Sequence, residues 1–308
     1  MGSRLSGILI LVGLLGLAAQ PCLGWGVAGH MVVTQIAYER LEPETRAEVD
    51  RLVELLADFE PKSDHAMTAS LWMDQVRGAG WRSMDRWHYM SLPYNADGLA
   101  EMPSVHPDNA VEAIRQSIRT LKSPEAPDLA KAIMLRVLLH VVGDLHQPLH
   151  SASRITAERP EGDRGGNDFR LLDTEGKPSN LHRLWDSGFG ALPKLTADAA
   201  GMEAAVPVAV RIVERVPEDR VPEWRDPDPE QWSRESFRLV TSVVYEGISE
   251  GRAPSEVYQA KARLVIQRRI ALAGYRLAAT LEDALSPSLF TRTIPKPQPA
   301  EKGETPRH

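Results

Sequence analysis

The stretch DLAKAIMLRVLLHVVGDLHQPLH, residues 128–150, combines a strong helix signal with a dense group of potential metal ligands. Residues 128–145 are apolar on more than one face, which is typical of a helix that is buried on all sides. His140 and Asp144 are four residues apart, so their side chains share one helix face, one turn apart. We therefore expect a central, buried helix whose imidazole and carboxylate can bind one metal ion.

A buried histidine and aspartate can also simply pair with each other, because burying a charge is costly unless it is paired or bound to metal. Repetition of the pattern favours metal. The stretch NLHRLWD, residues 180–186, places His182 four residues before Asp186, and an aspartate and a histidine stand beside tryptophans in LWMD (71–74) and RWH (86–88). So many ligands exceed the needs of one tetrahedral zinc ion and indicate a cluster of two or three ions, a type of site suited to phosphate-ester cleavage.

The first 24 residues read as a secretory signal peptide. Arg4 precedes an apolar run from Ile8 to Ala19, which is shorter than the roughly 20 residues of a membrane-spanning helix. Cleavage before Trp25 predicts a secreted or periplasmic protein without a stable membrane anchor. The only cysteine, Cys22, lies in this leader, and a lipoprotein anchor there is a weaker interpretation because of the preceding proline.

Composition and charge restrict the class of protein. The chain has 308 residues, 43% of them hydrophobic and 25% charged, and a formal charge of −6 that becomes −7 once the leader is removed. Duplex-binding proteins usually neutralise phosphates with lysine and arginine, so a basic nucleic-acid groove is not expected. Bound divalent cations are an alternative source of positive charge.

Most of the mature chain is predicted to be helical. Besides residues 128–145, apolar residues recur at helical spacing in segments 44–56, 109–121, 234–250 and 254–285, whereas a short hairpin starting at 168–172 is the main strand signal. We expect an all-α fold with one domain over residues 25–288. The Pro-, Lys- and Glu-rich residues 289–308 read as a disordered tail.

The order of these motifs resembles the S1/P1 nucleases, also called type I nucleases. Members of that family begin, after signal removal, with Trp-Gly-x-x-Gly-His, and the mature start here is Trp25-Gly-Val-Ala-Gly-His30. The similarity continues through the motifs Trp72-Met-Asp74, His88-Tyr89, His140-Val-Val-Gly-Asp144, Gln147-Pro-Leu-His150, Gly165-Gly-Asn167, Asn180-Leu-His182 and Trp185-Asp186. The resemblance implies a mainly helical domain of the S1/P1 nuclease and zinc phospholipase C type, with a cleft that holds three zinc ions.

Carried over residue by residue, the resemblance implies three sets of zinc ligands: Asp74, His88, His140 and Asp144; then the α-amino group and carbonyl of Trp25 with His30 and the shared Asp144; then His150, His182 and Asp186. The α-amine becomes a ligand only after signal cleavage. A hydroxide bridging the two ions that share Asp144 would attack phosphorus in line, in single-stranded RNA or DNA, and leave 5′-phosphorylated products. 3′-Nucleotidase activity is a further expectation from the family, and no obligate protein partner is evident.

Three further positions match family site residues. Arg77, one helical turn after Asp74, is expected near the scissile phosphate, Tyr89 is expected to stack on a nucleobase, and Asn167 is expected to contact the substrate. Solvent exposure for Arg77 and core packing for Tyr89 are the competing interpretations. Ser91 replaces the aspartate of fungal members, which changes any hydrogen bonding to the base edge, and the cysteine-free mature chain suggests a bacterial-type member.

Two other functions compete with a nuclease. A zinc phospholipase C would share the metal-binding terminal tryptophan and the helical three-zinc design, but the motifs around residues 144–150 and 180–186 favour the nuclease. A zinc-sequestering protein without turnover has little need for a shared Asp144 or for Arg77. His146 faces away from His140 by helical geometry and is expected to have a structural role.

Overall fold

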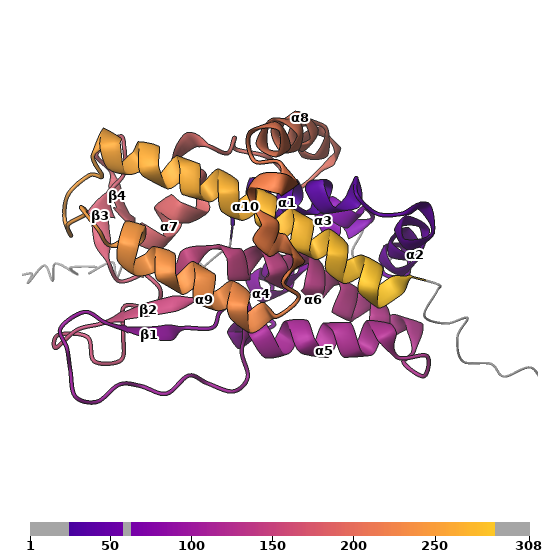
Figure 1. The fold of residues 1–308 in the computed structure, drawn as a ribbon, viewed down its shortest axis with the longest axis horizontal. Coiled ribbons are helices and arrows are strands. Elements are labelled where there is room, and N and C mark those ends of the chain that lie inside the picture. Colours follow the sequence, from indigo (N-terminus) through magenta and orange to yellow (C-terminus); the bar gives the residue numbers. More distant parts are fainter. Residues whose placement is uncertain (1–24, 58–62, 287–308) are drawn as a thin grey trace, which may run out of the picture.

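The computed structural model describes residues 25–57 and 63–286. The predicted leader (residues 1–24) and the predicted tail (residues 289–308) lie outside the described residues. Helices make up most of the described chain and surround one central helix (Figure 1). The mainly helical fold expected from the sequence is confirmed.

The helices of three or more turns pack into one bundle. They are α1 (Val27–Tyr38), α2 (Pro43–Glu54), α5 (Ala110–Lys122), α6 (Asp128–His146), α8 (Ala199–Arg215), α9 (Pro229–Leu239) and α10 (Glu256–Leu285). The shorter α3 (Ala66–Ala69), α4 (Trp72–Gly78) and α7 (Leu181–Asp186), with the 3-10 turns η2 (Asp85–His88), η3 (Pro148–His150), η4 (Gly188–Gly190), η5 (Glu218–Arg220) and η6 (Pro222–Arg225), connect them. None of the helices in the described part of the chain is long and apolar enough to span a membrane.

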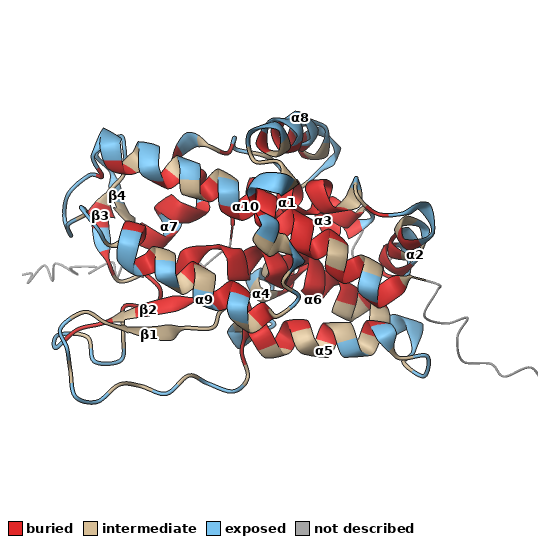
Figure 2. Ribbon diagram, viewed as in Figure 1, coloured by how far each residue is buried: buried red, intermediate tan, exposed pale blue. Residues whose placement is uncertain are grey.

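Helix α6 is the centre of the bundle. Every residue from Leu135 to His146 is buried, and α1, α2, α5, α9 and α10 all pack around it (Figure 2). A helix that presents apolar side chains on all faces gains stability only when neighbours cover every face. The expectation of a central, buried helix is therefore confirmed.

Helix α1 was not among the segments picked out by periodicity, and its burial explains why. All residues from Ala28 to Ala37 are buried, so the helix has no polar face that would produce an amphipathic pattern. It packs closely against α10, where the absence of a side chain at Gly274 makes room for Ile36. The first turn of α1 carries His30, so this packing also positions part of the site described below.

The predicted helix over residues 234–250 is wrong at both ends. Helix α9 begins at Pro229, because Asp228 caps it by accepting a hydrogen bond from the Glu230 N–H and proline suits the first helical position. It ends at Leu239 and continues only as a π-turn, η7 (Val240–Val244), before a turn in which Gly247 has a φ of 70°. Helix α8 was not predicted from the sequence.

Two small sheets flank the bundle. Strand β3 (Arg170–Leu172) pairs antiparallel with β4 (Pro178–Asn180), which confirms the hairpin expected after residue 168. Strand β1 (Leu92–Asn95) pairs in parallel with β2 (Ala152–Ile155), with Leu92 opposite Ala152. The parallel pair joins segments about sixty residues apart and was not predicted from the sequence.

A buried charged network holds the C-terminal end of α6. The Nε of Arg269 donates to the carbonyl of His146, Nη1 of Arg276 donates to Nε2 of His146 at 3.0 Å, and both guanidiniums pair with Glu235. His146 thus faces α9 and α10 rather than His140, as expected. Because the network bonds the last residue of α6, it also anchors the start of the loop that leads to His150.

The contact between α1 and α10 gives a stability prediction. A Cβ on Gly274 would lie 2.5 Å from Cγ2 and 2.6 Å from Cβ of Ile36, so we expect Gly274→Ala to lower the free energy of unfolding by about 1–3 kcal/mol through overpacking. Gly78→Ala is the matched control, because no atom lies within 4 Å of the Cβ it would add. Urea denaturation of both variants checks this; equal stability of the two would contradict the close contact.

Candidate metal centre

Three groups of histidine and aspartate side chains gather where α1, α4, α6, α7 and two 3-10 turns converge. The groups are His30, His140 and Asp144; Asp74, His88 and His140; and His150, His182 and Asp186, with the potential ligand atoms of each group within 4.8 Å of one another. All eight residues come from the positions expected from the sequence. Segments far apart in the chain thus supply one cluster of nitrogen and oxygen donors.

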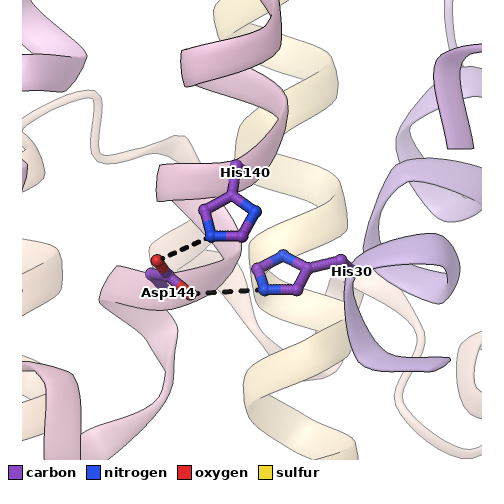
Figure 3. Close-up of side chains that lie close together, drawn as sticks. All are labelled: His30, His140 and Asp144. Carbon is purple, nitrogen blue, oxygen red and sulfur yellow. Dashed lines mark ion pairs between the residues drawn. The ribbon is translucent and has the colours of Figure 1, made fainter. Parts of the chain in front are cut away.

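Asp144 lies at the centre, and its two oxygens face different histidines. Oδ1 is 3.3 Å from Nε2 of His30, whereas Oδ2 is 3.0 Å from Nδ1 of His88 and 3.1 Å from Nε2 of His140. Figure 3 shows His140 and Asp144 one turn apart on α6, with His30 reaching toward the carboxylate from α1. This arrangement is what a carboxylate shared between two cations requires.

Two glycines allow close packing around the first turn of α1, and one of them, Gly143, lies on α6. A Cβ on Gly143 would lie 3.1 Å from Nδ1 of His30, and a Cβ on Gly29 would lie 2.4 Å from Cβ of Trp25. Trp25 is fully buried, and the N–H of the next residue, Gly26, donates to the carbonyl of Asp186 at 3.2 Å. Close packing therefore explains Gly143, which lies against His30, and Gly29, which lies against Trp25.

Backbone carbonyls orient three of the imidazoles. The Nδ1–H of His140 donates to the carbonyl of Ser70, that of His150 to His88, and that of His182 to Gly165. A carbonyl can only accept, so in each neutral ring the Nε2 atom carries a lone pair directed into the cluster. Such outer hydrogen bonds are the usual way in which proteins orient metal-binding histidines.

The third group shows why a cation fits between these residues. Nε2 of His150 and Nε2 of His182 are 3.1 Å apart, and Nε2 of His182 is 3.4 Å from Oδ2 of Asp186. Two lone pairs facing each other cannot form a hydrogen bond, but two ligands of one tetrahedral zinc ion lie about 3.3–3.5 Å apart. Spacing and donor chemistry therefore both suit zinc.

Polar atoms buried without hydrogen-bond partners support the same conclusion for the other two groups. They are Oδ1 of Asp144, Oδ1 of Asp74 and both ring nitrogens of His30, none of which makes a hydrogen bond of good geometry to another described residue. Oδ1 of Asp74 is 4.0 Å from Nδ1 of His88 and 3.9 Å from Nε2 of His140, too far for hydrogen bonds. Buried atoms of this kind are costly unless something else binds them, and a metal ion would.

Electrostatics in the cluster favour a bound cation. Burial alone would lower the pKa of His140, but the carboxylates of Asp144 and Asp74 raise it to about 9. Burial would raise the pKa of Asp144, but His140 and His150 hold it well below its usual range. Burial lowers the pKa of His150 to about 3 and, together with His140, lowers the pKa of His30. One positive charge is thus stabilised beside the two carboxylates, and a metal ion can replace the proton there.

Gln147 is a residue of the centre to which sequence reasoning gave no role. Its amide is fully buried, donates from Nε2 to Oδ1 of Asp186 at 2.7 Å, and accepts from the Leu149 N–H. This bond turns the other oxygen of Asp186 toward His182. An amide in an apolar stretch, immediately before a proline, is the sequence signal that could have identified it.

The three residues expected to contact substrate lie on α4, directly after η2 and directly after the turn at residues 165–166. Arg77 follows Asp74 by one turn on α4 and pairs with Asp85 at 3.3 Å, and its side chain is mostly buried. Tyr89 is half-buried and follows His88 directly. Asn167 follows the Gly165-Gly166 turn, whose carbonyls accept from Nδ1 and the backbone N–H of His182, and its own amide donates to the carbonyl of Arg164.

Known proteins match this chain over nearly all of its described residues. The family model for S1/P1 nuclease matches residues 25–286. The chain is 26% identical to Endonuclease 2 of Arabidopsis thaliana over 86% of this chain and 91% of that protein, and 25% identical to Nuclease S1 of Aspergillus oryzae over 86% and 93%. It is 22% identical to Nuclease P1 of Penicillium citrinum over 82% of this chain and 95% of that protein.

These matches favour the nuclease interpretation over the phospholipase C. The matched region contains every residue of the three groups as well as Trp25, and it covers the whole of the described helical bundle. A family model that fits the whole of the described bundle is a stronger criterion than the motifs alone, which end at residue 186. This chain belongs to the S1/P1 nuclease family.

Proposed function

We propose that the mature chain is a zinc-dependent endonuclease that hydrolyses single-stranded RNA and DNA to 5′-phosphorylated products, with 3′-nucleotidase activity in addition. As a member of the S1/P1 nuclease family, the chain is a hydrolase of phosphodiester bonds. The observation that carries the rest is the carboxylate of Asp144, whose two oxygens face separate sets of histidines. A single metal ion would need only one of these two oxygens.

Three zinc ions are proposed, each with its own ligands. Asp74, His88, His140 and Asp144 would hold the first; the α-amino group and carbonyl of Trp25, with His30 and Asp144, the second; and His150, His182 and Asp186 the third. In support, the donor atoms in each group are close together, and Trp25 is buried between the first turn of α1 and Asp186. The mature chain has no thiolate, so imidazole and carboxylate are the available zinc ligands.

Zinc ions at such a site supply positive charge for the phosphate and lower the pKa of water so that it is nucleophilic near neutral pH. The protein's own residues provide the rest. Buried α6 holds Asp144 in a rigid position, and the carbonyls of Ser70, His88 and Gly165 keep the imidazoles oriented. The metal ions would thus bring positive charge to a chain whose formal net charge is −6.

Three side chains at the edge of the centre are proposed to bind substrate. The guanidinium of Arg77, held by Asp85 beside the metal-binding turn of α4, would donate to phosphate oxygens as negative charge increases there. The ring of Tyr89 would stack on a nucleobase, a contact that tolerates any base. Asn167 would contact the substrate next to the turn that holds His182.

We also propose that residues 1–24 are a signal peptide and that the protein is secreted or periplasmic. The family model begins to match at Trp25, in agreement with cleavage before that residue. Cleavage would also create the α-amino group of Trp25, which is a proposed ligand of the second zinc ion.

The first test is cleavage of single-stranded RNA and DNA by zinc-loaded protein that begins at Trp25. We expect 5′-phosphorylated products, loss of activity in chelator, and recovery when zinc is restored, because the metal ions supply the positive charge and the activated water. A preparation with two extra residues before Trp25 should bind one zinc ion fewer and lose most activity. Release of no nucleotides by fully loaded protein would contradict the proposal and make phospholipids the next substrates to assay.

A second test compares two of the proposed ligands. Asp144→Asn should lower kcat/KM by at least about 10³-fold, because it weakens two zinc sites, whereas His182→Ala weakens one site and should cost about 10²-fold. Asp283→Asn, which changes an exposed carboxylate on α10, is the control and should leave kcat/KM unchanged. Steady-state kinetics and the zinc content after dialysis check this; equal, mild losses in the first two variants would count against a shared carboxylate.

A further inference from the structure

A surface pocket between α8 and α10 is separate from all the residues proposed to bind metal or substrate. Its volume is about 540 Å³, and the only polar side chains that line it are Arg211, Arg215, Arg263 and Gln267. The lining residues come from α8, α10 and the chain around η4, and α8 lies above α10 in Figure 1. The lining contains no carboxylate, although the chain as a whole is acidic.

Helical spacing directs the charged groups to the same place. Arg211 and Arg215 are four residues apart on α8, and Arg263 and Gln267 are four residues apart on α10, so each pair shares one face. The side chains of Arg211 and Arg215 make no ion pair within the described part of the chain, and Arg263 donates only to the carbonyl of Phe189, at 3.2 Å.

Other arginines on the same helix α10 are neutralised. Arg268 pairs with Glu223, and Arg269 and Arg276 pair with Glu235. Three like charges around one pocket repel each other, and like charges four residues apart destabilise a helix. A bound anion would remove this cost, and arginine forks match the oxygens of a phosphate group.

Apolar side chains beside the arginines indicate what carries the phosphate. Leu264 lines the pocket and is 70% exposed, and Val210 and Val206, one turn apart on α8, are 51% and 39% exposed. A single strand presents phosphates and apolar base faces in alternation, whereas a free phosphate ion would gain nothing from these side chains. The pocket wall at Gly190 is four residues after Asp186, hence at most about 15 Å from it between Cα atoms.

We propose that this pocket, the arginine pocket, binds backbone phosphates of single-stranded nucleic acid away from the cleaved bond; the inference rests on the proposed nuclease function. It makes the enzyme's affinity depend on strand length. A dinucleotide occupies only the metal centre, whereas a strand of tens of nucleotides also reaches the arginine pocket.

The test uses the zinc-loaded enzyme and the double variant Arg211→Ala/Arg215→Ala. Its matched control is Arg115→Ala/Arg119→Ala, which removes two arginines at the same spacing from α5. We expect the arginine-pocket variant to raise KM for a 20-nucleotide single strand by about 5–10-fold, since two phosphate contacts are lost, and to leave kcat/KM for a dinucleotide unchanged. The slope of log affinity against log salt concentration should become shallower by about 1.4.

A second measurement separates this inference from the nuclease function. Fluorescence anisotropy with a phosphorothioate-linked 20-nucleotide strand reports binding even if no bond is cleaved. Weaker binding in the arginine-pocket variant alone supports the inference, whereas equal binding in wild type and both variants overturns it. A titration with inorganic phosphate completes the test. If phosphate binding requires Arg211 and Arg215 but the affinity for the strand is the same in wild type and variant, the pocket binds the free ion, and the assignment to nucleic acid is overturned. Failure of wild type to cleave the dinucleotide would count against the nuclease function only.

Discussion

The carboxylate of Asp144 is fully buried among His30, His88 and His140, and the packing of α1, α6 and η2 is arranged around it. A charge in such a position is costly unless other charges or a metal ion compensate it, and the histidines that surround it come from three separate segments. The fold brings those three segments together. Helix α6 supplies a rigid, buried base, α1 crosses it where Gly143 leaves room for an imidazole, and the turn η2 ends at His88.

Hydrogen bonds from surrounding residues hold the candidate metal ligands in position. Imidazoles are held by carbonyls of turns and helix ends, Asp186 is held by the amide of Gln147, and the last residue of α6 is held by Arg269. Metal binding to such a centre adds to folding free energy, because the unfolded chain does not hold the ligands together. In the proposed exported form, whose mature part has no cysteine, this coupling would supply stability that other secreted proteins obtain from disulfides.

The candidate ligands on α6 and α7 could be predicted from the residues alone because their signals are local, whereas His30 was expected only from the resemblance to the family. A histidine and an aspartate four residues apart on a helix share one face whatever the rest of the chain does, and this holds for α6 and α7 alike. Features that depend on tertiary contacts could not be predicted in this way. Helix α1 has no amphipathic pattern because it is buried on every side, the pairing of β1 with β2 joins distant segments, and the arginines of the arginine pocket face one another only because α8 packs on α10.

Anomalous diffraction at the zinc edge, from crystals of the chain that begins at Trp25, would show how many metal ions Asp144 binds. We expect two zinc peaks on opposite sides of the Asp144 carboxylate, each bound to a different oxygen, and a third peak between His150, His182 and Asp186. A single peak beside Asp144, or a carboxylate that binds only protonated imidazoles in zinc-saturated crystals, would contradict the view that this one side chain organises the centre.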